Sequence, residues 1–202
     1  MKKELAYYTI GGALGWSQDW FPRGWMRLGG CAAVAACDVS ILLSRDDGIT
    51  SMYPHDTSRI TREAYLEFSE VMRPYLHPRW SGIDSLKIFI DGFGKYIHDV
   101  HADEFIRLDG IEGTEPWEEA RDAIVAEIDR GRAVPFLMLY HQGREFDEYE
   151  WHWFNLAGYD DEAEDGFRVK AVTYGNFEWL NLERLWDTGY EKRGGIILVN
   201  DR

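Results

Sequence analysis

A cysteine and a histidine in this chain are spaced as a nucleophile and its base. Cys31 follows two glycines and opens an apolar run that continues to Leu43, and His152 opens a second, largely apolar segment much later. If the first run is a helix, its N-terminus carries partial positive charge, which favours the thiolate. An imidazole within reach of that thiol can take its proton. The two residues therefore indicate covalent chemistry through sulfur.

The second cysteine has a different environment. Cys37 lies inside the apolar run, where a cysteine usually serves as a small core hydrophobe. Two cysteines six residues apart on one helix point in different directions and do not pair readily. The lack of a disulfide framework is typical of a reducing cytoplasm. The first residues include two lysines but no apolar core of a signal peptide, so a cytoplasmic protein is expected.

Length and charge limit the partners. A chain of 202 residues predicts one domain with a substantial core. The formal net charge of -14 argues against nucleic acid and against anionic membrane surfaces, which attract clustered Lys and Arg. No apolar stretch approaches the roughly 20 residues of a membrane helix. We therefore expect no nucleic-acid partner, no membrane and no cofactor.

Hydrophobic periodicity indicates helices first and strands afterwards. Glycines punctuate the first 30 residues, which read as irregular. Helices are expected at 31–44, 61–72, 85–97 and from a cap at Thr114 to Gly131, with a helical turn at 182–186. Strands are expected at 133–140, 151–159, 166–174 and 195–199. This order predicts a single α+β domain over 1–202, with a helical part at about 16–130 and a sheet part at about 131–202.

Three segments carry a family resemblance. They are Gly-Gly-Cys-Ala-Ala-Val-Ala at 29–35, Ile-Asp-Arg-Gly-Arg-Ala-Val-Pro at 128–135, and His-Trp-Phe-Asn-Leu-Ala-Gly-Tyr-Asp at 152–160. Together they resemble the papain-like cysteine peptidase superfamily, and more closely its bacterial bacteriocin-leader-peptidase branch. The resemblance spans 16–199, although the helices between 50 and 125 match only in kind. It implies a papain-like fold with Cys31 as nucleophile and His152 as base.

Alternation along the histidine strand adds an expectation from the residues themselves. His152, Phe154 and Leu156 should share one face of the strand. We expect this face to be turned toward the helix that carries Cys31.

A third residue should orient the imidazole. In the family an Asn or Asp occupies the end of the strand after the histidine strand. Asn176 is the expected residue here because its amide oxygen can accept from the ring, with Thr173 as the alternative. Asn176 lies one to three residues late, which departs from the family pattern, and a turn residue after Gly175 is the competing interpretation.

The resemblance also implies an oxyanion donor. Family members have a glutamine six residues before the cysteine, but Trp25 occupies that position here. Gln18, thirteen residues before Cys31, is the expected donor if a longer loop brings its amide to the site, and an ordinary loop glutamine is the alternative. The backbone N–H of Cys31 can supply one donor in either case.

A pair of histidines resembles a metal site more weakly. His98 and His101 lie three residues apart beside Asp99 and Asp103. A metal site needs further converging ligands, and none can be assigned, so we interpret the segment as a solvated helix end and expect no metal.

Three functions are compatible with this pattern. The leading one is a cysteine peptidase, a thiol hydrolase whose partner is a peptide or amide substrate cleaved through an acyl-enzyme. The second keeps the Cys–His pair but transfers the acyl group to an amine or hydrolyses a non-peptide amide. The third is a papain-like binding protein with an incomplete site. Tryptophans flank the expected site and suit any of the three: Trp16, Trp20, Trp25, Trp151 and Trp153.

Overall fold

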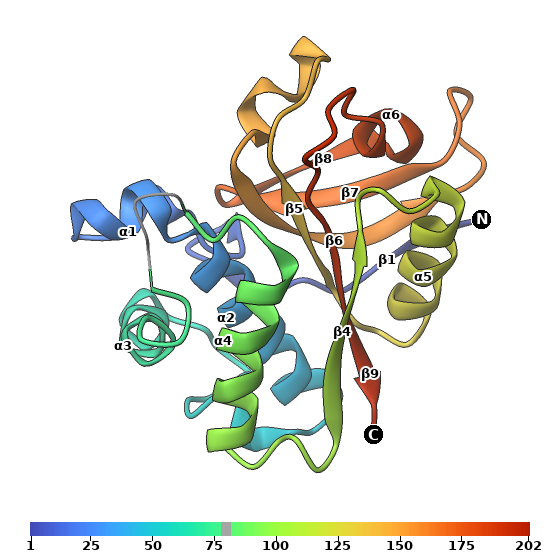
Figure 1. Cartoon of the computed structure of the whole chain (residues 1–202). Coiled ribbons are helices and arrows are strands. Elements are labelled where there is room, and N and C mark those ends of the chain that lie inside the picture. Colours follow the sequence, from blue (N-terminus) through green and yellow to red (C-terminus); the bar gives the residue numbers. More distant parts are fainter. Residues whose placement is uncertain (78–81) are drawn as a thin grey trace.

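A seven-stranded sheet forms the centre of the protein (Figure 1). The computed structural model describes residues 1–77 and 82–202. The sheet order is β4-β9-β5-β6-β7-β8, β1 also pairs with β6, and these pairings are antiparallel. The strands are β1 (Lys2–Glu4), β4 (Ile106–Glu112), β5 (Val134–Met138), β6 (His152–Asp160), β7 (Arg168–Thr173), β8 (Asn176–Asn181) and β9 (Gly195–Asp201). A separate small hairpin pairs β2 (Thr9–Ile10) with β3 (Ala13–Leu14).

The longer helices precede most of the sheet along the chain. They are α2 (Cys31–Asp46), α3 (Arg62–Met72), α4 (Leu86–Asp99) and α5 (Trp117–Asp129). The shorter helices are η1 (Gln18–Trp20), α1 (Gly24–Gly29), η2 (Thr50–Met52), η3 (Arg144–Tyr149) and α6 (Leu182–Trp186). The predicted α+β class is confirmed, and each predicted helix and strand has its counterpart within a few residues.

The sheet is packed on both faces because successive strand residues point in opposite directions. Leu137 and Trp153 belong to a core shared with α2, α3 and α4. Their neighbours Phe136 and Phe154 belong to a second core shared with α5 and α6. Strand β6 therefore lies between two layers of helix, with α2 on one side and α5 on the other.

Helix α2 is buried nearly all round, as its continuous apolar run predicts. Ala32, Ala35, Val39 and Leu42 are buried in the core, whereas Val34 is only partly buried. One charged residue, Asp38, is also buried here, with 3 % of its surface exposed.

Capping residues explain where two of the outer helices begin. Thr61 accepts a hydrogen bond from the N–H of Ala64 at the start of α3, and Ser85 accepts one from Ile88 at the start of α4. The expected cap at Thr114 is wrong, because α5 begins after Pro116 and has no side-chain cap. Proline suits that place, since its fixed φ is compatible with the first turn and the missing N–H has no helical partner there.

Several short elements differ from expectation. The region before Cys31 contains β1, β2, β3, η1 and α1 rather than only irregular chain. Strand β4 lies inside the part expected to be helical and pairs along its whole length with β9. Strand β8 occupies a stretch where no strand was expected and pairs with β7. These segments are short or partly exposed, so sheet pairing rather than a strong hydrophobic period defines them.

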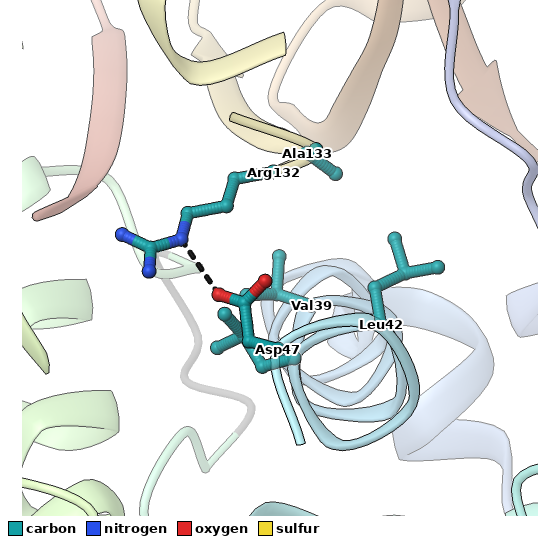
Figure 2. A pocket seen from close by; sticks show the side chains of 7 residues that line it. Val39, Leu42, Asp47, Arg132 and Ala133 are labelled. Atoms are coloured by element: carbon teal, nitrogen blue, oxygen red, sulfur yellow. Dashed lines mark hydrogen bonds and ion pairs between the residues drawn. The ribbon is translucent and has the colours of Figure 1, made fainter. Parts of the chain in front are cut away.

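Arg132 ties the helical layer to the sheet at the C-terminal end of α2. Its Nε lies 2.8 Å from a carboxylate oxygen of Asp47 across a small pocket between α2 and the start of β5 (Figure 2). Its other nitrogens donate to the Val199 carbonyl at 2.6 Å and to Asp201 at 2.5 Å. A guanidinium bound on all three sides fixes this end of the helix against β9.

Candidate active site

Cys31 is the first residue of α2 and is partly buried. Helix α1 ends at Gly29, so only Gly30 separates the two helices. A Cβ on Gly30 would lie 2.4 Å from the Met26 carbonyl oxygen, far inside contact distance. Glycine is therefore required at this joint, and the joint places the thiol at the N-terminal end of the central helix.

The thiol is surrounded by backbone donors but is poorly solvated. The N–H groups of Trp153, Ala32 and Cys31 itself stabilise the thiolate, yet desolvation by burial is the larger effect and raises the pKa of Cys31. The backbone N–H groups at the helix N-terminus favour the thiolate, as expected, but they do not lower the pKa of Cys31 overall. Burial disfavours the charged form more strongly than the nearby dipoles favour it.

His152 is the first residue of β6 and is 4 % exposed. Its Nε2 lies 2.7 Å from the hydroxyl oxygen of Thr173 at the end of β7. Burial lowers the pKa of His152 from 6.5 to about 4, so the ring is neutral at neutral pH. The hydrogen bond to Thr173 occupies one ring nitrogen and leaves Nδ1 as the nitrogen for a further partner.

Three interactions link the surroundings of the thiol to those of the imidazole. The Trp153 N–H that acts on the Cys31 thiol belongs to the residue directly after His152. The Tyr174 ring stacks on the His152 ring with centroids 4.8 Å apart and planes 5° apart. Burial is the main cause that raises the pKa of Tyr174 to about 12, and negative charge on Cys31 is the next. The start of β6, which carries His152 and its partner Thr173, therefore lies against the end of α2 that carries Cys31.

The face of β6 that meets α2 is not the expected one. Phe154 and Leu156 pack in the core with α5, whereas Trp153 packs in the core with α2. The expected alternation is present, but its assignment to the α2 side is wrong. It is the start of the strand, with the Trp153 backbone, that meets the thiol.

Asn176 lies at the exposed start of β8. Its Oδ1 accepts a hydrogen bond from the N–H of Phe177 at 2.9 Å. The hydrogen bond of the imidazole goes instead to Thr173, which pairs with Asn176 across the β7–β8 turn. The structure thus places the alternative third residue, rather than the first choice, against His152.

Gln18 is buried in η1, and its Nε2 donates to the Arg27 carbonyl at 3.0 Å. Its Oε1 is buried without a hydrogen-bond partner among the described residues. The segment around it lies near the histidine side of the site, because Leu14 N–H donates to the Gly175 carbonyl at 2.9 Å and a Cβ on Gly175 would lie 3.3 Å from Trp20. The segment that contains Gln18 thus contacts the β7–β8 turn through Leu14 and Trp20, while Trp25 lies exposed on α1.

Tyr174 is the residue of the site that the sequence analysis missed. It adopts a left-handed backbone with φ 51°, and Trp151, next to His152, does the same with φ 52°. Aromatic residues rarely adopt this conformation, and strained backbone of this kind concentrates at functional sites. The only signal in the sequence is the position of Tyr174 between Thr173 and Gly175.

The histidine pair on α4 has an ordinary local partner. His98 Nδ1 lies 2.8 Å from an Asp103 carboxylate oxygen. Within the described residues, no group of three His, Cys, Asp or Glu side chains is arranged to hold a metal ion.

Comparisons with known proteins add no assignment. No protein-family model matches the chain, and no curated protein matches it. In the described part of the chain, none of the helices has the length and apolar character to span a membrane.

Proposed function

We propose that the protein is a thiol hydrolase that cleaves a peptide or amide bond through a Cys31 acyl-enzyme. The observation that carries the proposal is the meeting of Cys31, at the start of the central helix, with the strand that begins at a buried His152 oriented by Thr173. The resemblance of the three sequence segments to papain-like cysteine peptidases supports the same assignment.

The resting site holds a neutral thiol and a neutral imidazole. Burial raises the pKa of Cys31 and lowers that of His152, so proton transfer between them is unfavourable before substrate binds. In the proposed mechanism Nε2–H donates to Thr173, which leaves the lone pair on Nδ1 free to accept the thiol proton. General-base catalysis then accompanies the attack of sulfur on the substrate carbonyl.

The remaining steps balance without a cofactor. The Sγ–C bond forms and the carbonyl electrons move to oxygen, where the Cys31 backbone N–H and the Gln18 amide are the proposed donors. Collapse breaks the C–N bond, and the imidazolium gives its proton to the leaving amine. Water then attacks the thioester, His152 takes a proton from that water, and the thiol is regenerated as the acid product leaves.

The test compares the two cysteines. Cys31→Ser is expected to abolish cleavage of a mixed peptide library followed by mass spectrometry, while Cys37→Ala serves as the control because Cys37 is fully buried. Intact mass after substrate addition should show an acyl adduct that maps to Cys31. Cleavage that survives Cys31→Ser and His152→Ala with the fold intact would overturn the proposal and favour a binding protein.

A further inference from the structure

A buried polar network joins the helix of Cys31 to the strand of His152. Asn155 on β6 donates from Nδ2 to the Ala35 carbonyl of α2 at 3.2 Å. The same nitrogen donates to the Tyr7 hydroxyl at 3.1 Å, and that hydroxyl donates to Asp38 Oδ2 at 2.8 Å. The Asn155 amide is therefore linked to α2 twice: directly at Ala35, and through Tyr7 at Asp38.

The carboxylate at the end of this network is held by three phenols. Besides Tyr7, the Tyr8 hydroxyl donates to Asp38 at 2.5 Å and the Tyr65 hydroxyl donates at 2.8 Å. A buried carboxylate is tolerated when its oxygens are satisfied in this way. The donors come from the N-terminal segment and from α3, so Asp38 is an anchor shared by several parts of the fold.

The network lies close to the candidate site on both elements. Asn155 is three residues after His152, about 10 Å along a strand. Ala35 is four residues after Cys31, about 6 Å along a helix. The far end of α2 is already held by Arg132 and Asp47 (Figure 2). A second tie near the N-terminus therefore sets the position of the helix end that carries the thiol.

Stability alone does not explain Asn155. Its Oδ1 is buried without a hydrogen-bond partner among the described residues. An unsatisfied buried acceptor is destabilising, and an apolar residue of similar size avoids that cost. An apolar residue at this position would lack the hydrogen bond that joins β6 to α2.

We propose that Asn155 is a positioning residue that holds Cys31 in register with His152, and that Tyr7 and Asp38 hold the Asn155 amide in place. The inference rests on the proposed function because it takes Cys31 and His152 to be the working pair. It assigns no contact between Asn155 and substrate.

The test is a double-mutant cycle on the reactivity of Cys31, which needs no substrate. The rate of Cys31 alkylation by iodoacetamide at neutral pH is measured by peptide mapping, with and without His152→Ala, in several backgrounds. In the parent protein, His152→Ala is expected to slow alkylation at least about tenfold, because the base is lost. In the Asn155→Leu and Tyr7→Phe backgrounds, adding His152→Ala is expected to slow alkylation of Cys31 less than about threefold, because the Cys–His pair is already misaligned.

Tyr8→Phe is the matched control. It removes one phenol from Asp38, as Tyr7→Phe does, but Tyr8 makes no hydrogen bond to Asn155. The full effect of His152→Ala should therefore persist in Tyr8→Phe. Ser40→Ala is a second control, since the Ser40 hydroxyl donates to the Ala36 carbonyl within α2. If Asn155→Leu does not fold, Tyr7→Phe alone carries the comparison.

The outcomes separate the two proposals. An equal effect of His152→Ala in all backgrounds overturns the positioning role and leaves the thiol hydrolase standing. Equal losses in Tyr7→Phe and Tyr8→Phe also overturn it, because they would reflect only a weakened Asp38 anchor. No effect of His152→Ala in the parent protein contradicts the Cys–His pair itself, and with it both proposals.

Discussion

The ring of Tyr174 lies flat on the ring of His152, with centroids 4.8 Å apart and planes 5° apart. Tyr174 reaches this position from a left-handed backbone conformation, with φ 51°. The stack covers a face of the imidazole and contributes to the burial that lowers the pKa of His152 to about 4. The strained turn between β7 and β8 therefore holds the Tyr174 ring where it makes the candidate base harder to protonate.

Replacing Tyr174 should raise the pKa of His152. Tyr174→Ala and Tyr174→Gly both remove the ring, so the imidazole gains solvent and its pKa should move from about 4 toward 6.5. Glycine also removes the left-handed strain, so Tyr174→Gly should be more stable than Tyr174→Ala by about 1 kcal/mol. The pKa is followed by NMR titration of the histidine ring protons, with His152→Ala identifying the resonance, and the stability by urea unfolding. A pKa that stays near 4 in both variants would show that other parts of the site desolvate the ring.

Thr173, rather than Asn176, should orient the imidazole. Thr173→Val keeps the shape but leaves the buried Nε2 without its 2.7 Å partner, which should cost about 1–3 kcal/mol of stability and slow His152-dependent alkylation of Cys31. Asn176→Ala is the matched control and should stay within about 0.5 kcal/mol of the parent, because its Oδ1 bonds to the exposed backbone of Phe177. Thermal unfolding and alkylation rates measure both effects. Loss of reactivity in Asn176→Ala alone would reverse the assignment.

The sequence predicts the framework of the site better than its details. Long apolar runs predict the start of α2 at Cys31 and, within one residue, the start of β6 at His152, because their burial outweighs local alternatives. The hydrogen-bond partner of the imidazole could not be predicted from the sequence, because the choice between Thr173 and Asn176 depends on where β7 turns into β8. That turn is defined by sheet pairing between residues that hydrophobicity does not distinguish.

The missed network around Asp38 has a different cause. In the sequence, Asp38 is simply one charged residue in an apolar helix. Its phenol partners lie at distant positions in the chain. Tyr7, Tyr8 and Tyr65 have nothing in their local sequence that marks them as donors to one carboxylate. Only the tertiary packing of α2 against α3 and the N-terminal segment brings them together.

The titration of Asp38 and that of His152 should change the free energy of unfolding with pH in opposite directions. Burial raises the pKa of Asp38 from 3.8 to about 6, so the folded protein binds more protons there than the unfolded chain, and this contribution to stability is lost as pH rises from about 4 to 6. The pKa of His152 falls from 6.5 to about 4, so its contribution is lost as pH falls from about 6.5 to 4. Each effect is on the order of 3 kcal/mol, and over the shared window the two largely cancel.

Single substitutions should separate the pH dependence that Asp38 contributes from the one that His152 contributes. In Asp38→Asn the free energy of unfolding should rise more steeply with pH between about 4 and 6 than in the parent protein, because the opposing Asp38 contribution is removed. In His152→Gln the free energy of unfolding should fall relative to the parent protein as pH rises over the same range, because the opposing His152 contribution is removed. Urea unfolding at several pH values measures both, and Glu63→Gln, at an exposed site on α3, serves as the control. Parallel pH profiles for the Asp38 and His152 variants would contradict the assignment of these two groups.

Overpacking α2 should test how tightly this helix is held against β6. Ala35 is 2 % exposed, and its carbonyl accepts from Asn155, so a larger side chain there has no room to relax toward solvent. Ala35→Leu is expected to cost about 1–3 kcal/mol in urea unfolding, because added methylenes force neighbouring side chains or the backbone to shift. Val34→Leu is the matched control, since Val34 is only partly buried and an added methylene there has more room. Because a shift of α2 moves its first residue with it, Ala35→Leu should also slow His152-dependent alkylation of Cys31, whereas Val34→Leu should not. Unchanged stability and reactivity in Ala35→Leu would show that α2 can move against the sheet at little cost.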